Sequence, residues 1–188
     1  TGIVYLNYFL NVPPSLSDIP SVATYEDKAV GPVYFTVSDR ETAPSALSVS
    51  ATSSNPWLVP STSVSFTGTD TSRYLTVRPA LNRSGSAIVT VTVKDSHGAT
   101  KSDAFAVSVV AVNDPPVAQI DRGVRYPNRS LKIRISALLR NDYDVDGDVL
   151  SVISYSSRSY MGAMISQSGE YLVYTPPWGM NSSDYFGY

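Results

Sequence analysis

The sequence contains no cysteine and only one histidine, His97, among its 188 residues. The absence of cysteine excludes disulfide bonds, CxxC redox motifs, cysteine-based zinc sites and cysteine nucleophiles. A single histidine leaves little room for histidine-based metal catalysis or for a conventional Ser-His-Asp triad. The sequence also lacks a G-x-S-x-G motif, a phosphate-binding P-loop and a dinucleotide-binding fingerprint. We therefore expect that the protein is not an enzyme.

Charge and long apolar runs are also scarce. Charged residues make up 16% of the chain, and 14 basic against 16 acidic residues give a formal net charge of -2. Nucleic-acid binders usually carry a basic patch, so we expect no nucleic-acid partner. The apolar stretch at residues 3–10 is far shorter than the ~20 residues that span a bilayer, and it lacks the basic start of a signal peptide. We expect no membrane insertion and interpret this stretch as a β-strand.

Short alternating runs of β-branched and aromatic residues are abundant. In the clearest runs, Val or Ile alternates with Thr, Ser or Ala, as a strand with one buried face requires. Turn signals such as Asp95-Ser96-His97-Gly98 separate the runs. Short strands with turns every ten or so residues predict an all-β fold of immunoglobulin-like β-sandwiches. The predicted strands lie at residues 32–37, 47–51, 74–77, 87–93, 104–110 and 184–188, and residues 130–139 alternate and then end in one predicted helical turn.

The chain repeats itself after about 100 residues, which is the size of one such sandwich. Asn11-Val12-Pro13-Pro14 recurs as Asn113-Asp114-Pro115-Pro116, and Asp39-Arg40-Glu41 recurs as Asp144-Val145-Asp146. Because Pro-Pro cannot donate ladder hydrogen bonds, each pair should mark the extended entry into a domain. We predict a strand of an upstream module at residues 1–11, a complete β-sandwich at 12–112 and a second, truncated β-sandwich at 113–188 that lacks its last strands.

A truncated sandwich has an open sheet edge, and open edges favour strand addition. The strand predicted at residues 3–10 would have no partner within its own module. We hypothesise that it completes the truncated module of a neighbouring chain. This predicts self-association that is lost when residues 1–11 are removed.

The most informative stretch runs from Asn141 to Asp148 and contains Asp142, Asp144, Asp146 and Asp148 around Gly147. Alternating carboxylates on a turning loop suit Ca2+, which takes six to eight oxygen ligands. The stretch begins like an EF-hand loop, but its twelfth position is an isoleucine instead of the bidentate glutamate, and strands flank it. The sequence therefore predicts Ca2+ binding without an EF-hand. The alternative is a solvated acidic turn, although so many like charges repel one another without a cation.

Other acidic or amide side chains stand where they can join such a site. Asp39 and Glu41 occupy the positions that Asp144 and Asp146 occupy in the second repeat, and a surface turn explains them equally well. These carboxylates stand in turns instead of facing each other across a cleft, so glycosidase chemistry is not expected. The remaining candidates are Glu26, Asp95, Asn113 and Asp114.

Two stretches carry a family resemblance. Residues 93–98, running on to Val110-Ala111-Val112-Asn113-Asp114-Pro115-Pro116, are similar to the end of a cadherin repeat, where an Asp-x-Gly turn precedes a strand and an acidic linker. Residues 139–148, with 171–177 and 184–186, look like a bacterial repeat pattern. The chain thus resembles the cadherin-like and immunoglobulin-like tandem repeats of large secreted or cell-surface proteins, chiefly bacterial adhesins. The resemblance covers most of the chain.

The resemblance implies that Ca2+ lies at the junction between modules and stiffens the rod. In such families its ligands come from both modules and the linker, which here implicates Glu26, Asp95, Asn113, Asp114, Asp144 and Asp146. Val112 stands where a cadherin linker has an acid, which predicts that the downstream junction binds Ca2+ more weakly than a cadherin junction does. Asn11-Val12-Pro13-Pro14 has no acid at all, which predicts an upstream junction poor in calcium.

The function implied is that of a structural or adhesion module of a secreted or cell-surface protein. Its expected partners are neighbouring modules and a cell-surface protein or carbohydrate. The alternative is a carbohydrate-binding accessory module of a secreted enzyme, since Trp57, Trp178 and 13 tyrosines provide aromatic surface. Tyrosine pairs across strands and a turn closed by Trp57 are the simpler explanation of these residues.

Overall fold

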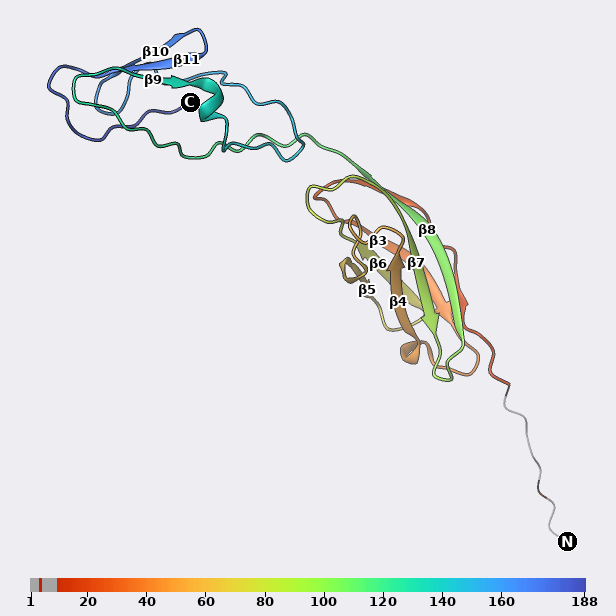
Figure 1. Cartoon of the computed structure of the whole chain (residues 1–188). Coiled ribbons are helices and arrows are strands. Elements are labelled where there is room, and N and C mark those ends of the chain that lie inside the picture. The colour runs from red at the N-terminus through yellow and green to blue at the C-terminus, as the bar shows by residue number, and fades with distance from the viewer. Residues whose placement is uncertain (1–3, 5–9) are drawn as a thin grey trace. The chain divides into compact units, whose positions relative to one another are not determined.

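The computed structural model describes residues 4 and 10–188, so most of the predicted strand at 3–10 lies outside the described residues. The chain divides into two compact units, unit 1 (Thr1–Val112) and unit 2 (Asn113–Tyr188) (Figure 1). Strands are the main regular elements of both units, and the predicted all-β fold is confirmed. No helix of the described residues is long and apolar enough to cross a membrane.

Unit 1 consists of two four-stranded sheets (Figure 1). All neighbouring strands are antiparallel except β2 and β8, which run parallel. One-turn 3-10 helices at Pro44–Ala46 and Ser61–Ser63 lie in the connections. In spatial order, the first sheet contains β1 (Ser15–Leu16), β3 (Val30–Ser38), β6 (Ser72–Val77) and β5 (Val64–Thr67), and the second contains β2 (Val22–Tyr25), β8 (Thr100–Val110), β7 (Gly85–Lys94) and β4 (Ser48–Ser53).

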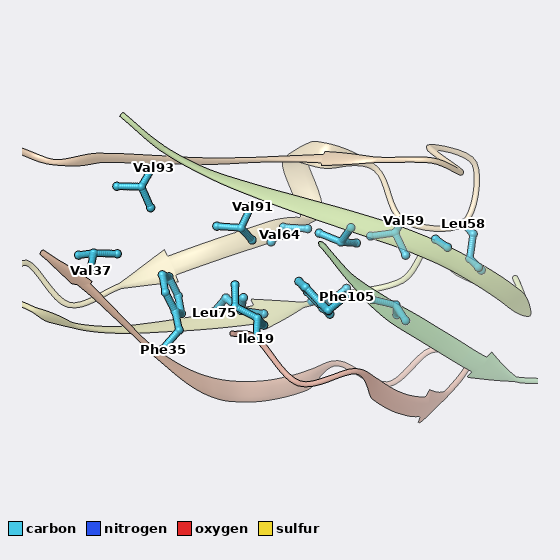
Figure 2. Packing of buried hydrophobic residues seen from close by; sticks show 14 of the residues in the cluster. Ile19, Phe35, Val37, Leu58, Val59, Val64, Leu75, Val91, Val93 and Phe105 are labelled. Atoms are coloured by element: carbon cyan, nitrogen blue, oxygen red, sulfur yellow. The ribbon is translucent and has the colours of Figure 1, made fainter. Parts of the chain in front are cut away.

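The core of unit 1 lies between its sheets and follows the alternation of the sequence. Along β7, valines alternate with residues that face solvent, and Val91 and Val93 are fully buried. Phe35 and Leu75 meet them from the first sheet (Figure 2). Full burial of one such side chain contributes about 1.5–3 kcal/mol. The pattern that predicted these strands is therefore also what holds the two sheets together.

Unit 2 contains one three-stranded sheet in the order β10 (Met164–Ser168), β11 (Tyr171–Thr175) and β9 (Leu131–Arg134). The one-turn helix α1 (Ile135–Leu138) follows β9 directly, so the predicted alternation and helical turn are confirmed. The sheet packs over a small core that includes Leu138, Ile165, Leu172 and Tyr174.

The strand predicted at residues 184–188 is wrong. Residues 184–188 do not form a strand, because they make too few ladder hydrogen bonds. Two isolated contacts remain. The Tyr160 N–H donates to the Tyr185 carbonyl at 2.9 Å, and Gly187 pairs with Ser156: the Ser156 N–H donates to the Gly187 carbonyl at 2.9 Å, and the Gly187 N–H donates to Ser156 Oγ at 3.3 Å. Ser54 and Ile88 of unit 1 make the same two contacts, at 2.9 and 2.8 Å. The internal repeat thus extends to individual hydrogen bonds.

Candidate functional site

Two aspartate-led loops stand at corresponding positions in the two units. We call residues 39–42 entry loop 1 and residues 144–148 entry loop 2. Asp39 Oδ1 accepts the N–H groups of Glu41 (2.9 Å) and Thr42 (2.7 Å). Asp144 Oδ1 accepts the N–H groups of Asp146 (2.9 Å) and Asp148 (3.3 Å). Short acidic side chains favour such turns because they bond to their own backbone two residues ahead.

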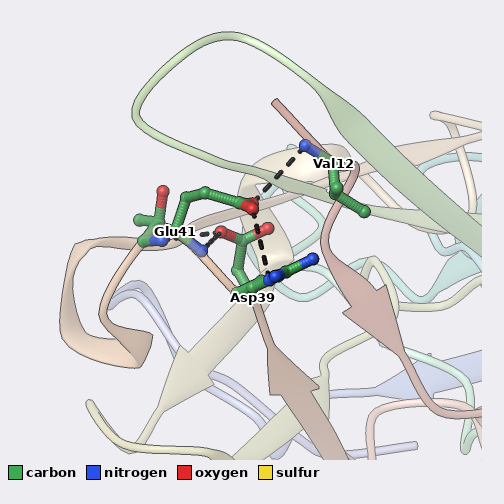
Figure 3. Close-up of polar contacts among 5 residues, drawn as sticks. Val12, Asp39 and Glu41 are labelled. Atoms are coloured by element: carbon green, nitrogen blue, oxygen red, sulfur yellow. Dashed lines mark hydrogen bonds and ion pairs between the residues drawn. The ribbon is translucent and has the colours of Figure 1, made fainter. Parts of the chain in front are cut away.

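Each entry loop holds the chain segment that enters its unit. The Val12 N–H donates to Glu41 Oε2 at 3.4 Å (Figure 3), and the Asp114 N–H donates to Asp146 Oδ2 at 2.6 Å. Both donors stand directly before Pro-Pro, and both acceptors stand two residues after the leading aspartate of the loop. The sequence repeat is therefore also a repeat of a structural arrangement.

The turn that begins at Asp95 lies beside entry loop 1, at the same end of unit 1. Asp95 is 4% exposed, its Oδ1 accepts the N–H groups of His97 (2.8 Å) and Ala99 (2.9 Å), and its Oδ2 accepts a hydrogen bond from the Asn11 amide (3.0 Å). Burial raises the pKa of Asp95, but these hydrogen bonds outweigh burial and lower the pKa below its ordinary value. The Thr42 and Ser96 hydroxyls, 2.9 Å apart, join entry loop 1 to the Asp95 turn.

Two acceptor oxygens at this end lack a donor. Asn11 Oδ1 and Asp39 Oδ2 are buried, and neither has a hydrogen-bond partner among the described residues. A buried acceptor without a partner costs about 1–3 kcal/mol. These oxygens therefore suit a cation or a donor from outside the protein. Sequence reasoning missed Asn11, although the repeat aligns it with Asn113.

Glu26 lies at the opposite end of unit 1. It is buried, its Oε1 accepts the Val112 N–H at 2.5 Å, and its own N–H donates to the Val110 carbonyl at 2.9 Å. Asp95 precedes the first residue of β8, whereas Glu26 lies beside the last residue of β8. The eleven residues of this strand span about 33 Å, so the two carboxylates lie far apart. The expectation that Asp95 and Glu26 serve one metal site is therefore wrong. The parallel pairing of β2 with β8, which sequence patterns do not predict, places them apart.

The acidic residues of unit 2 do not share one centre. Asp142 Oδ1 accepts the Gln119 N–H at 2.7 Å, whereas Asp144 and Asp146 organise entry loop 2. The Tyr188 hydroxyl donates to Asp121 Oδ2 at 2.6 Å and lies 3.3 Å from Asp142 Oδ2. Burial and these two carboxylates raise the pKa of Tyr188. Sequence reasoning missed Asp121, which has no acidic neighbour in the chain.

The remaining predicted ligands have separate positions. The Asn113 amide donates to the Asp114 carbonyl at 3.0 Å, and Asp148 lies in entry loop 2. Within residues 4 and 10–188, no three acidic or histidine side chains converge closely enough to form a ready-made metal site. Any Ca2+ ligand set must therefore include backbone or amide oxygens, water, or a movement of the carboxylates.

The two sheets of unit 1 and the repeated entry arrangement place the chain in the class of immunoglobulin-like tandem repeats. Residues 113–188, which form unit 2, match the model of a family described as the bacterial Ig domain. This match confirms the resemblance to immunoglobulin-like repeats of bacterial surface proteins. No curated protein matches the chain.

Several solved structures are similar to this chain. The Ig1-2 module of the Drosophila receptor protein tyrosine phosphatase DLAR is 10% identical with a TM-score of 0.39, covering 94% of this chain and 96% of that one. Domains 4 and 5 of the S-layer protein SbsC are 22% identical with a TM-score of 0.36, covering 52% and 54%. The Bacteroides ovatus protein SGBP-B, solved with a mixed-linkage heptasaccharide, is 14% identical with a TM-score of 0.32, covering 93% and 43%.

Proposed function

We propose that this chain is a structural and adhesive section of a secreted or cell-surface tandem-repeat protein, and that its entry loops bind Ca2+. The observation that carries the proposal is the repeated entry arrangement in two consecutive units, one of which matches the bacterial Ig domain. That family is a non-catalytic module type, which agrees with a mechanical role. Its partners would be neighbouring modules and a cell-surface protein or carbohydrate.

The chemistry of the entry loops supports the calcium part of the proposal. Ca2+ prefers carboxylate, amide and carbonyl oxygens. Entry loop 2 provides Asp144 and Asp146 beside Asp114, and the matching end of unit 1 provides the unpartnered oxygens of Asn11 and Asp39. Bound Ca2+ would neutralise these carboxylates and fix each entering segment to its loop. Because the described residues form no ready-made acidic cage, we expect the Kd of extracellular modules, about 10⁻⁴–10⁻³ M.

Thermal melting with Ca2+ and with EDTA tests this proposal. With a Kd of about 1 mM, about 10 mM Ca2+ would stabilise the folded state by about 1.4 kcal/mol, because a ligand bound only by the folded state shifts the folding equilibrium. That corresponds to a rise of about 6–11 °C in Tm for a domain of 60–100 residues, at about 4–8 °C per kcal/mol. The double variant Asp144→Asn, Asp146→Asn should lose most of this rise in unit 2.

Asp70→Asn is the matched control, because Asp70 lies in an exposed turn of unit 1. Among the described residues, its carboxylate accepts a hydrogen bond only from the N–H of Thr71. This variant should keep the full response to Ca2+. Equal melting curves with Ca2+ and EDTA, or a response of unit 2 that survives in the double variant, would contradict calcium binding by entry loop 2. The structural role itself does not depend on that outcome.

Carbohydrate binding is a second candidate, because both tryptophans face solvent. Trp57 is 83% exposed and Trp178 is 91% exposed, so neither ring is used in a core. The Gly179 N–H donates to Asn128 Oδ1 at 2.7 Å and fixes the loop that presents Trp178. An exposed indole ring can stack on the apolar face of a sugar.

A glycan array tests this second function. We expect any glycan bound by the wild-type protein to be lost with Trp178→Ala or Trp57→Ala, since each change removes one aromatic surface. The entry-loop variant Asp146→Asn is the control and should keep the binding. Absence of glycan binding by the wild-type protein would exclude the accessory-module alternative.

A further inference from the structure

Strand β4 has one side without a partner. It pairs with β7 in unbroken register from Ser48 opposite Lys94 to Ser53 opposite Val89, and no described strand lies on its other side. The Ser54 N–H donates to the Ile88 carbonyl on β7. Backbone groups alternate along a strand, so those of Val49, Ala51 and Ser53 point to the outer edge.

The burial of β4 shows that this edge is open. Val49 and Ala51 face the core but remain partly exposed, whereas Val93 and Val91, which lie opposite them on β7, are fully buried. This difference means that solvent reaches the inner face of β4 from the side. No described residue donates to or accepts from the outer backbone groups of Val49, Ala51 and Ser53.

The other edges of unit 1 carry protective features that β4 lacks. Proteins protect sheet edges with short strands, prolines, charges or bulges. Strand β1 has two residues and follows Pro13-Pro14, and β2 has four residues and is followed by Glu26-Asp27-Lys28. Strand β5 has four residues and ends at the Gly68 turn. Strand β4 has six residues, Ser-Val-Ser-Ala-Thr-Ser, with no charge, proline or bulge.

We propose that β4 pairs antiparallel with β4 of a second copy of this chain, around a two-fold axis at Ala51. Val49 then lies opposite Ser53 of the second copy, and Ala51 lies opposite its own counterpart. These three residue pairs each exchange two hydrogen bonds, so every outer N–H of the strand gains an acceptor. The two four-stranded sheets become one continuous sheet of eight strands.

A second copy suits this edge because the strand is complementary to itself. In the paired register, Ser50 faces Thr52 of the second copy, so hydroxyl groups meet and no like charges repel. A charged partner would find no opposite charge on the strand. The pairing uses neither the entry loops nor residues 3–10, and it is therefore independent of Ca2+ and of the strand exchange predicted from the sequence.

The pairing must be weak for a single unit. One strand edge buries far less than the ~1,200 Å² of a stable interface. We therefore expect a dimer that forms with rising protein concentration, at micromolar to millimolar levels. In a tandem array, several such edges would add through effective concentration, so that weak contacts support lateral or homophilic association.

Sedimentation equilibrium across that concentration range tests the pairing with the full chain. Ala51→Pro removes one outer N–H but no hydrogen bond to β7, and proline is tolerated where the N–H of an edge strand faces solvent. We expect the wild-type protein to dimerise and Ala51→Pro to stay monomeric. A wild-type monomer at every concentration, or an Ala51→Pro dimer of unchanged affinity, would overturn the proposal.

Two further experiments keep the test decisive if Ala51→Pro fails to fold. Thr52→Lys places a cation on each copy at the proposed interface and should weaken dimerisation. Ser108→Lys is its control, because Ser108 is exposed on β8 away from the edge and its charge should leave the dimer unchanged. Since the chain lacks cysteine, Ser50→Cys combined with Thr52→Cys should give a disulfide-linked dimer on oxidation. Equal effects of the two lysines, or no linked dimer, would count against the pairing.

Discussion

At the scale of single residues, the acidic side chains have structural roles before any cation is considered. Asp39, Asp95 and Asp144 each accept two backbone N–H groups of their own loop. Such bonds set the conformation of the turn. Aspartate at these positions is therefore explained by loop geometry, while the unpartnered oxygens of Asn11 and Asp39 are what point to a further ligand.

Asp95→Asn tests the role of this charge through the pH dependence of stability. The pKa of Asp95 in the folded protein lies below its unfolded value of about 3.9. Its ionised form therefore stabilises the folded state above that pH, and this contribution is lost as the pH falls through the folded pKa. Urea unfolding should show the variant clearly less stable at neutral pH, with a difference that narrows below about pH 4. A difference that does not change with pH would assign the loss to packing instead of charge.

At the scale of elements, the sequence predicts what is local and misses what depends on long-range pairing. The alternation in β7 and β8 predicts both strands, because a buried face requires period two. The segment 184–188 alternates as well, yet it has no continuous ladder, so alternation alone does not make a strand.

The predicted site residues also divide into those that a local sequence pattern identifies and those whose position depends on long-range contacts. The repeat identifies both entry loops correctly, because their hydrogen bonds join residues two to four positions apart. The grouping of Asp95 with Glu26 fails because the direction of β8 decides which end of the sandwich each residue occupies. Asp121 and Tyr188 are 67 positions apart in the sequence, and no local sequence pattern predicts the hydrogen bond between them.

At the scale of the whole molecule, the two units are built from one plan but have unequal cores. The buried cluster of unit 1 has sixteen hydrophobic residues from both sheets and the segments that connect their strands, whereas that of the described part of unit 2 has six. Val149 and Ile153 of unit 2 are almost fully exposed, although they follow an entry loop as β4 does in unit 1. Because buried apolar area is the main stabilising term, we expect unit 2 to unfold before unit 1.

Paired core substitutions test whether the units are independent in stability. Leu75 and Leu172 are both fully buried, and each contacts a cluster made only of residues from its own unit. Leu75→Ala and Leu172→Ala should each cost about 2–5 kcal/mol, confined to the unit that carries the change. Amide hydrogen exchange in mild urea can measure the two units separately, because protection of β7 reports the stability of unit 1 and protection of β11 reports that of unit 2. Leu172→Ala should speed exchange in β11 and leave β7 unchanged, and an equal loss of protection in both strands would show that the two cores unfold as one cooperative body.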